Sequence, residues 1–319
     1  MVKEKKRLII LDSNSIIHRA FHALPPLTTK KGEIVNAVYG FLLVFLKAVK
    51  EFKPNYIAAC FDFPAPTFRH KKFKKYKAKR PKAPDELYEQ IPKVKQVLKA
   101  FDVKVLEKEG FEADDIIGTI SKKFPEKQIL PEVETIILSG DLDILQLVDK
   151  HTKVYLLKRG VKNTVLYDED LVRERYEGLS FDQLIDLRAL RGDPSDNIPG
   201  ITGIGEKTAI KLLKEFTTLE NLYKHLEGRT KESAQIKPRI KELLTRYKEQ
   251  AFFSQELATI YKNVPIEVSP KSYRWDKYDK SKAIKVLEEF GFNSLIKRLS
   301  EKPEKEKEQE KSAKELTLW

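Results

Sequence analysis

The runs LIILD at residues 8 to 12, YIAACFD at 56 to 62 and TIILSGDLD at 135 to 143 decide the fold. Short apolar runs of this kind, rich in β-branched or aromatic residues, are typical of strands buried on both faces of a parallel sheet. Helical patterns lie between them, at residues 38 to 52 and 87 to 101. This alternation predicts an α/β domain with a wound, mainly parallel sheet over residues 1 to 180.

The pattern becomes all-helical over residues 181 to 299. Two amphipathic segments, FDQLIDLRALRG at 181 to 192 and EKTAIKLLKEF at 206 to 216, flank a glycine-rich turn. We expect this region to form a second, α-helical domain. Residues 301 to 314 contain no apolar residue except alanine, so residues 300 to 319 should form a disordered, charged tail with a short apolar peptide at its end.

The composition indicates a polyanionic partner. The chain has 61 Lys and Arg against 48 Asp and Glu, a net charge of +13, which favours nucleic acid, although basic charge also serves solubility. Cys60 lies in an apolar run and indicates a small buried hydrophobe. The first apolar run has only four residues, too few for a signal sequence or a membrane span, so we expect a cytoplasmic protein.

Acidic residues gather where the predicted strands end. Asp12, Asp62, Asp141 and Asp143 follow the three apolar runs, at the sheet edge where ligands bind. Two further segments add five acids: Glu112, Asp114, Asp115, Asp193 and Asp196. Any one of these could be a turn former or a helix N-cap. Together, nine carboxylates would repel one another unless divalent cations such as Mg²⁺ or Mn²⁺ neutralise them, so the joint pattern predicts a metal site.

The basic segment, FRHKKFKKYKAKRPK at residues 68 to 82, holds nine Lys or Arg and no acid. On a helix, Arg69, Phe73, Tyr76 and Arg80 would share one face. Such a face can hold phosphates on guanidinium groups while an aromatic ring stacks on a base. A solvated basic loop is the alternative, but the interleaved aromatic residues favour nucleic-acid contact.

A glycine-rich turn, NIPGITGIGEKTA, precedes the second amphipathic segment. Gly200, Gly203 and Gly205 allow a tight turn with outward N–H groups, and the following helix presents its positive end with Lys207 and Lys211 one turn apart. Such a turn can grip phosphate without reading sequence. A purely structural connection between two helices is the alternative.

Two other patterns suggest no chemistry. His18 and His22 lie four residues apart, but no cysteine or third histidine lies near them, so we expect no zinc site. Ser139 lacks the GxSxG context of a serine nucleophile.

These motifs closely resemble the 5′ nuclease (flap endonuclease) family, and in particular the N-terminal nuclease domains of bacterial DNA polymerases I. The matching stretches are ILDSNSIIHRAFHALPPLTTKKGEIVNAVYGF, FDFPAPTFRHKKFKKYKAKRP, GFEADDIIGTI, SGDLDILQLV and GDPSDNIPGITGIGEKTA, and the resemblance covers residues 7 to 299. It implies a resolvase-like or PIN-like nuclease core, a helical arch over the active site at about residues 68 to 90, and a helix-hairpin-helix module that grips duplex DNA. Two departures are Arg191, at a position where we expect variable residues, and the lack of a polymerase after the nuclease, which we therefore expect to act as a stand-alone chain.

The resemblance also implies roles for individual residues. The family's metal-binding acids match Asp12, Asp62, Glu112, Asp114, Asp115, Asp141, Asp143, Asp193 and Asp196. One ion would lie mainly on Asp62, Glu112 and Asp114 and a second on Asp143, Asp193 and Asp196, with Asp141 between them and Asp12 and Asp115 acting through water. Arg69, Tyr76, Lys77 and Arg80 match the arch motif and would contact the scissile phosphate.

The implied reaction is two-metal hydrolysis of branched, flapped or nicked duplex DNA that leaves a 5′ phosphate and a 3′ hydroxyl. The resemblance further implies a monomer, with a monovalent cation at the hairpin. Two alternatives stay open: a metal-dependent ribonuclease acting on RNA primers, which the hairpin disfavours, and a non-catalytic binder of branched DNA, which the complete acid set disfavours.

The final pentapeptide, ELTLW, resembles the short motif by which bacterial replication proteins dock on the sliding clamp. Leu316, Leu318 and Trp319 could fill an apolar pocket, and a flexible tether to a clamp or a polymerase would raise the local concentration of a nuclease at its junction. A chance match of five residues is the alternative.

Overall fold

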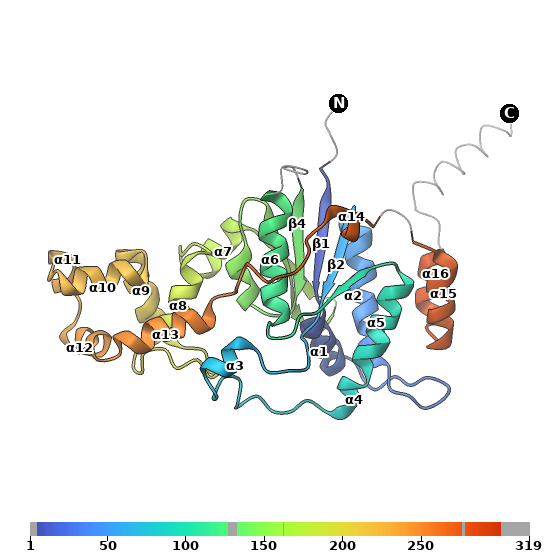
Figure 1. Ribbon diagram of the computed structural model, residues 1–319, viewed down its shortest axis with the longest axis horizontal. Helices are drawn as coiled ribbons and strands as arrows, with labels where there is room; N and C mark the ends of the chain where they lie inside the picture. The colour runs from blue at the N-terminus through green and yellow to red at the C-terminus, as the bar shows by residue number, and fades with distance from the viewer. Residues whose placement is uncertain (1–4, 127–132, 162, 276–277, 301–319) are drawn as a thin grey trace.

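The computed structural model describes residues 5–126, 133–161, 163–275 and 278–300. Its centre is a six-stranded sheet in the order β3-β2-β1-β4-β5-β6, shown in Figure 1. The strands are β1 (Arg7–Asp12), β2 (Tyr56–Cys60), β3 (Lys104–Leu106), β4 (Glu134–Ser139), β5 (Thr152–Arg159) and β6 (Asn163–Tyr167). The three apolar runs form β1, β2 and β4, side by side and parallel, and only β6 is antiparallel. The predicted α/β architecture is confirmed.

The register of the sheet aligns the acidic strand ends. Asp12 pairs with Cys60 of β2, and Leu11 pairs with Leu138 of β4. Because these parallel strands run in one direction and this register aligns their ends, the residues that follow β1, β2 and β4 leave the sheet at one edge.

Helices cover both faces of the sheet. The helical segments up to residue 191 are α1 (Ser13–Ala23), α2 (Asn36–Phe52), α3 (Phe68–Lys72), α4 (Asp85–Tyr88), α5 (Gln90–Ala100), α6 (Ala113–Glu126), the 3₁₀ turn η1 (Asp143–Leu147), α7 (Glu169–Arg175) and α8 (Gln183–Arg191). Ile9 and Leu11 point into the layer formed by α1, α2 and α5, whereas Leu8 and Ile10 point into the opposite layer, which includes α6 and α8.

A helical unit extends away from the sheet on the left of Figure 1. Its elements are α9 (Glu206–Phe216), α10 (Leu219–Glu227), α11 (Lys231–Ala234), α12 (Pro238–Arg246) and α13 (Lys248–Ala258). The amphipathic segments at 181 to 192 and 206 to 216 form α8 and α9, as predicted. α13 packs along α8 and carries the chain back toward the sheet.

The end of the predicted helical domain belongs to the sheet unit instead. After α14 (Pro270–Tyr273), the last two helices, α15 (Lys280–Glu289) and α16 (Asn293–Ser300), lie outside α5 on the right of Figure 1. Ala283, Leu287 and Leu295 are fully buried there in the layer that includes α2 and α5. The expectation of one helical domain over 181 to 299 is therefore wrong for α15 and α16, because their apolar faces complete the other core.

No helix in the described part of the chain is long and apolar enough to cross a membrane. Residues 301 to 319, with Leu316, Leu318 and Trp319, lie outside the described residues, so the clamp-docking hypothesis stays a prediction.

Candidate active site

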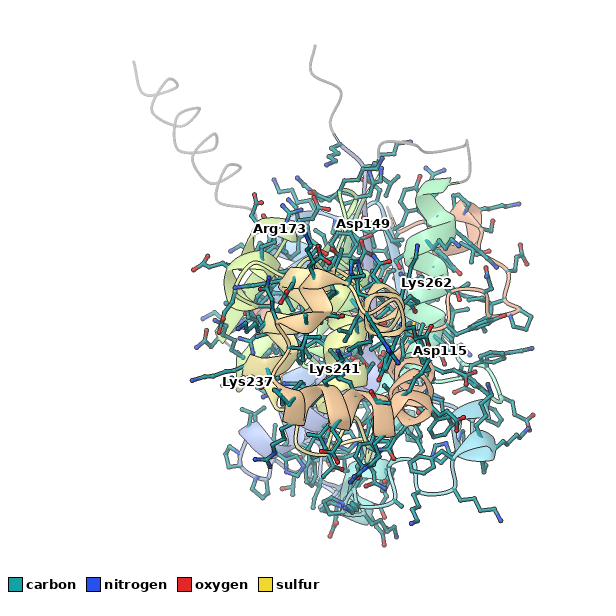
Figure 2. All side chains as sticks on the ribbon, turned by 90° about the vertical axis from the view of Figure 1, so that its left-hand side faces the viewer. Asp115, Asp149, Arg173, Lys237, Lys241 and Lys262 are labelled. Atoms are coloured by element: carbon teal, nitrogen blue, oxygen red, sulfur yellow. The ribbon has the colours of Figure 1, made fainter. Side chains whose placement is uncertain are left out.

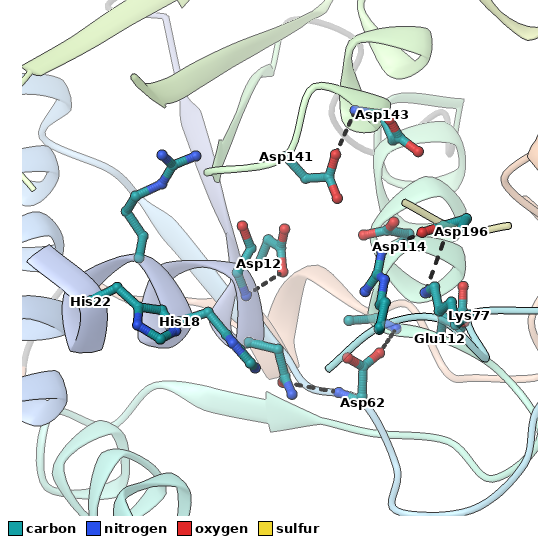
Figure 3. Close-up of a pocket in the computed structure, with 15 residues that line it drawn as sticks. Asp12, His18, His22, Asp62, Lys77, Glu112, Asp114, Asp141, Asp143 and Asp196 are labelled. Atoms are coloured by element: carbon teal, nitrogen blue, oxygen red, sulfur yellow. Dashed lines mark hydrogen bonds and ion pairs between the residues drawn. The ribbon is translucent and has the colours of Figure 1, made fainter. Parts of the chain in front are cut away.

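A cleft of about 420 Å³ opens at the carboxyl ends of the parallel strands, shown in Figure 3. We call it the acidic cleft. It is lined by Asp12, Asn14, Ser15, His18, Arg19, His22, Asp62, Lys77, Arg80, Glu112, Ala113, Asp114, Asp141, Asp143 and Asp196. Seven of the nine predicted acids line it, and Asp115 and Asp193 do not.

Hydrogen bonds from backbone N–H groups and a hydroxyl hold the acids at the strand ends. Asp12 caps α1 by accepting from the Ser15 N–H, and it also accepts from the Ser139 hydroxyl of neighbouring β4. Asp62 accepts from the Ala113 N–H at 2.8 Å, which places it at the start of α6. Asp141 accepts from the N–H of Asp143 at 2.8 Å. These hydrogen bonds fix the three carboxylates at the edge of the sheet where β1, β2 and β4 end.

Four acids of the cleft differ from the others in their ionic contacts. Within the described residues, Asp12, Asp62, Asp114 and Asp141 form no side-chain ion pair. Burial, together with repulsion from Asp141 and Asp62, raises the pKa of Asp12 to about 7. Burial and repulsion from Asp12 and Asp141 also raise the pKa of Asp114 well above its usual value. The cleft therefore gathers more carboxylates than its own cations pair with.

The basic segment supplies cations to a second pair of acids. The Lys77 ammonium lies 2.8 Å from a Glu112 oxygen and 3.9 Å from Asp196, and the Arg80 guanidinium pairs with Asp196. These partners outweigh the effect of burial and hold the pKa values of Glu112 and Asp196 below their usual values. Lys77 and Arg80 thus lie among the acids of the cleft, and their contact with a phosphate stays a prediction.

The chain reaches this position without the predicted helix. α3 ends at Lys72, and Phe73 is extended with φ −138° and ψ 97°. Turns follow, in which Tyr76, Ala78 and Arg80 donate to the carbonyls of Phe73, Lys75 and Lys77. Neither the shared helical face nor a helical arch over 68 to 90 is present, because Phe73 and Tyr76 are drawn into a small apolar cluster with Ile198 and Leu257.

Tyr76 lies in the interior and has no free ring face for a base. It is 4% exposed, and its hydroxyl lies 3.1 Å from Glu112 and 3.0 Å from Asp196. The prediction that it contacts the scissile phosphate or stacks on a base is wrong for this arrangement. Tyr76 instead links two acids of the cleft.

Arg69 and Asp115 also differ from their predicted roles. The Arg69 guanidinium is 2% exposed and forms a bidentate ion pair with Asp115, both contacts at 2.8 Å. Its other donors reach Glu112 and the carbonyls of Leu257 and Thr259. All five donors of the guanidinium are occupied, which leaves none for a phosphate. Asp115 is fully buried outside the cleft, so it is not placed to act on a metal, directly or through water.

The acids nearest the helical unit differ from each other. Asp143 pairs with Arg188 of α8, and burial with repulsion from Asp141 raises its pKa to about 8 despite that partner. Asp193 accepts from the N–H and the hydroxyl of Ser195 and lines a neighbouring hollow of about 800 Å³, together with Arg188 and Arg191. The acidic cleft and this hollow share Ser15, Arg19, Arg80, Asp141 and Asp143.

The donor set of the cleft fits hard divalent cations. In the described residues, no group of three Asp, Glu, His or Cys stands ready to hold an ion. Mg²⁺ rarely needs such a group, because it keeps several waters and binds through one or two carboxylates. Most ionisable donors of the cleft are carboxylate oxygens. Burial and repulsion between neighbouring carboxylates raise the pKa values of Asp12, Asp114 and Asp143, and a divalent cation would relieve that repulsion.

One wall of the cleft was missed in the sequence. Asn14, His18, Arg19 and His22 line it from α1, and the rings of His18 and His22 point into it in Figure 3. Their spacing of four residues, in a helix that starts directly after Asp12, is the signal that could have revealed them. Burial lowers the pKa of His18, which favours the neutral ring.

The glycine-rich turn between α8 and α9 combines structural and exposed positions. Gly200 has φ +56°, and a Cβ there would lie 2.1 Å from the Gly192 nitrogen. Its N–H donates to the Ser254 hydroxyl and its carbonyl accepts from Gln250. Gly200 therefore holds the turn on α13 and has no N–H left for a phosphate, contrary to our prediction.

The other predicted residues of the turn are open to solvent. Gly203, Gly205, Lys207 and Lys211 are all exposed where α9 begins. α12 lies beside this turn through Leu243, and it adds Lys237 and Lys241 at the end of the molecule that faces the reader in Figure 2. Lys207, Lys211 and Lys237 are exposed and Lys241 is partly exposed, which suits contact with a polyanion.

Residues 7–177 match the 5′-3′ exonuclease N-terminal resolvase-like domain, and residues 179–281 match the 5′-3′ exonuclease C-terminal SAM fold. A "5′-3′ exonuclease" of Aquifex aeolicus is 38% identical over 92% of this chain and 94% of its own length. DNA polymerase I of Bacillus subtilis is 41% identical over 99% of the chain, which spans 34% of that protein.

Solved structures share the fold. The T5 5′-exonuclease with bound zinc ions has a TM-score of 0.64 at 18% identity, covering 93% of this chain and all of its own. The catalytic core of Rad2 in complex with DNA substrate has a TM-score of 0.54 at 19% identity, covering 90% of this chain and 89% of its own.

Proposed function

The chain belongs to the 5′-3′ exonuclease family, and we propose that it is a metal-dependent 5′ to 3′ exonuclease and flap endonuclease. Its substrate would be branched, flapped or nicked duplex DNA, recognised by shape. The products would carry a 5′ phosphate and a 3′ hydroxyl.

The observation that carries this proposal is the acidic cleft, in which uncompensated carboxylates face Lys77 and Arg80. A purely DNA-binding surface gains nothing from buried acids that repel its ligand, whereas a phosphodiester hydrolase needs them for cations. Two structures that share the fold, the T5 5′-exonuclease with zinc ions and the catalytic core of Rad2 with a DNA substrate, agree with this proposal.

Asp12, Asp62, Asp114, Asp141 and Asp143 would hold two Mg²⁺ or Mn²⁺ ions, directly or through water. When bound, the ions would make water a nucleophile near neutral pH and neutralise charge on the attacking and leaving oxygens. Glu112 and Asp196 would add oxygen ligands that are not used in their ion pairs with Lys77 and Arg80. Asp193 lies at the edge of this set, where its contacts to Ser195 orient it.

Lys77 and Arg80 would bind the non-bridging oxygens of the scissile phosphate. Their positive charge is most useful when charge builds up on that phosphate in the transition state. His18 and His22 would form the opposite wall and limit where the nucleotide can lie. The exposed start of α9, with Gly203, Gly205, Lys207 and Lys211, would hold the phosphate backbone of the duplex, with a monovalent cation at the turn.

The test is cleavage of end-labelled flap, nicked, single-stranded and RNA-primed duplex substrates, with Mg²⁺ and with EDTA. We expect Mg²⁺-dependent cuts near the junction of the flap and nicked DNA, with ligatable 5′ phosphates. Binding without any cut in Mg²⁺ or Mn²⁺ would support the non-catalytic alternative. A strong preference for the RNA-primed duplex would support the ribonuclease alternative.

A further inference from the structure

The segment where the chain leaves α13 and returns to the sheet is held by three buried side chains. Arg69 donates to the carbonyls of Leu257 and Thr259, at 3.1 and 2.7 Å. Gln146 donates to the carbonyl of Ala258 and accepts from the N–H of Ile260. Asp115 accepts from the N–H of Tyr261 at 2.8 Å. Five consecutive residues, 257 to 261, thus each give one backbone polar group to a side chain from the sheet unit.

The three side chains come from the elements that carry the cleft. Arg69 lies in α3, which leads into Lys77 and Arg80. Asp115 lies in the first turn of α6 beside Asp114, and its carboxylate also accepts from the N–H of Glu112 at 3.1 Å. Gln146 lies in η1, which starts at Asp143. The exposed fractions of all three are 2% or less.

The other end of α13 holds the hairpin turn. Ser254 and Gln250 bind the N–H and the carbonyl of Gly200. A continuous set of hydrogen bonds therefore runs from the turn through α13 and residues 257 to 261 to the three elements of the cleft. Because every donor of Arg69 is used, a shift of this segment must disturb the contact between Arg69 and Glu112.

We propose that Arg69, Asp115 and Gln146 are positioning residues that set the cleft acids against the DNA-binding helical unit. This inference rests on the proposed function. It assigns a role to Asp115 and Arg69, for which the family resemblance implied contacts with metal and phosphate. Changes in groups that orient metal-binding carboxylates typically cost 10- to 100-fold in metal affinity or activity. The effect should therefore appear in the Mg²⁺ requirement.

A double-mutant cycle separates this role from independent roles in metal and phosphate binding. Arg69→Met and Asp115→Asn each leave one buried charge without its partner in the Arg69–Asp115 ion pair. The double variant removes both charges. We expect each single variant to raise the Mg²⁺ concentration for half-maximal cleavage about tenfold or more. The double variant should be no worse than the worse single one. Multiplying losses would overturn the proposal.

Three further measurements sharpen the test. Duplex affinity without divalent metal should stay within about twofold of wild type in all three variants, because the exposed lysines of α9 are untouched; a large loss would place Arg69 on DNA.

Arg69→Lys should resemble Arg69→Met, because an ammonium cannot replace the forked contacts; rescue by lysine would indicate a role of charge alone. Gln146→Leu should also raise the Mg²⁺ requirement, and an unchanged value would remove Gln146 from the set.

A matched control exists on the surface. Lys72 and Glu256 form an exposed ion pair between the same two elements, α3 and α13. Lys72→Met with Glu256→Gln should leave the Mg²⁺ requirement unchanged, since exposed pairs contribute little. An equal effect there would show that any link between these elements suffices, which contradicts the proposal.

Hydrogen exchange on the metal-free protein gives a readout without catalysis. The amides of Glu112 and Tyr261, both bound to Asp115, should lose protection together in Arg69→Met while the strand amides keep theirs. Unchanged protection at both sites would overturn the proposal. If the wild-type protein cut no DNA, the proposed function would fail. The hydrogen-exchange result would still test whether Arg69 and Asp115 hold residues 257 to 261 against the elements of the cleft. If Arg69→Met did not fold, Arg69→Lys would carry the same measurement, because it leaves both acceptor oxygens of Asp115 in place.

Discussion

The acids at the strand ends and the basic segment at residues 68 to 82 meet in one cleft, but different forces place them. Asp12, Asp62 and Asp141 leave parallel strands at one edge, so the sheet register fixes them. The basic segment has no such frame after α3 ends at Lys72. The position of each basic side chain follows from its ion-pair partner. Arg69 is buried in an ion pair with Asp115, whereas Lys77 and Arg80 pair with acids of the cleft and line it. Like residues in one motif thus acquire unlike roles.

The largest effect should come from the acids. Asp141→Asn keeps an oxygen that can accept from the Asp143 N–H but removes the charge that a cation needs. We expect single-turnover cleavage with Mg²⁺ to fall at least about a hundredfold, as loss of metal-ion catalysis implies, while flap DNA still binds. Asp170→Ala, an exposed acid of α7, is the control and should cut like wild type. Near-normal cleavage by Asp141→Asn would refute the metal assignment.

Arg80 tests the other side of the comparison. Arg80→Met should lower the cleavage rate about 10- to 100-fold even at saturating Mg²⁺, because the side chain stabilises charge on the phosphate and does not hold the ion. Lys82→Met alters the same segment at a residue that is exposed and pairs with Asp85, so it should change the rate less than twofold. Equal effects of the two substitutions would mean that the segment contributes only diffuse charge.

The uncompensated acids also predict how stability depends on pH. The folded-state pKa values of Asp12 and Asp143 are raised to about 7 and 8, so the folded protein binds more protons than the unfolded chain between about pH 4 and 8. In EDTA, its thermal midpoint should therefore fall by a few degrees from pH 5 to pH 8. The lowered pKa values of Glu112 and Asp196 make stability rise with pH, but only below that window. The lowered pKa of His18 also makes stability rise with pH and so opposes the effect of Asp12 and Asp143.

Mg²⁺ provides the control for this measurement. It should raise the thermal midpoint more at pH 8 than at pH 5, since protons compete with it for the same carboxylates. An equal rise at both pH values would show that Mg²⁺ binds elsewhere.

The sequence predicts the position of the strand-end acids but not that of the basic segment. Apolar runs that end in aspartate predict strands and a common edge, because register follows from the parallel arrangement. The periodicity that put Arg69, Phe73, Tyr76 and Arg80 on one helical face was misleading, since tertiary burial of Phe73 and Tyr76 overrides a weak local helix preference. Likewise, only the three-dimensional neighbours of Asp115 reveal that its partner is an arginine.

The smallest effect is expected from lysines that have no acid to hold them. Lys207 and Lys211 are exposed and, within the described residues, form no ion pair, in contrast to Lys77. Replacing both with methionine should weaken binding to every duplex sequence alike and reduce the slope of log affinity against log salt by about two, one for each lost phosphate contact. Cleavage at saturating DNA should be unchanged, because neither lysine lines the acidic cleft. Lys285 and Lys297, exposed on α15 and α16 beyond α5, give a charge-matched control that should leave the salt dependence intact. A loss confined to certain sequences, or an equal loss in the control, would show that the start of α9 is not the duplex-binding surface.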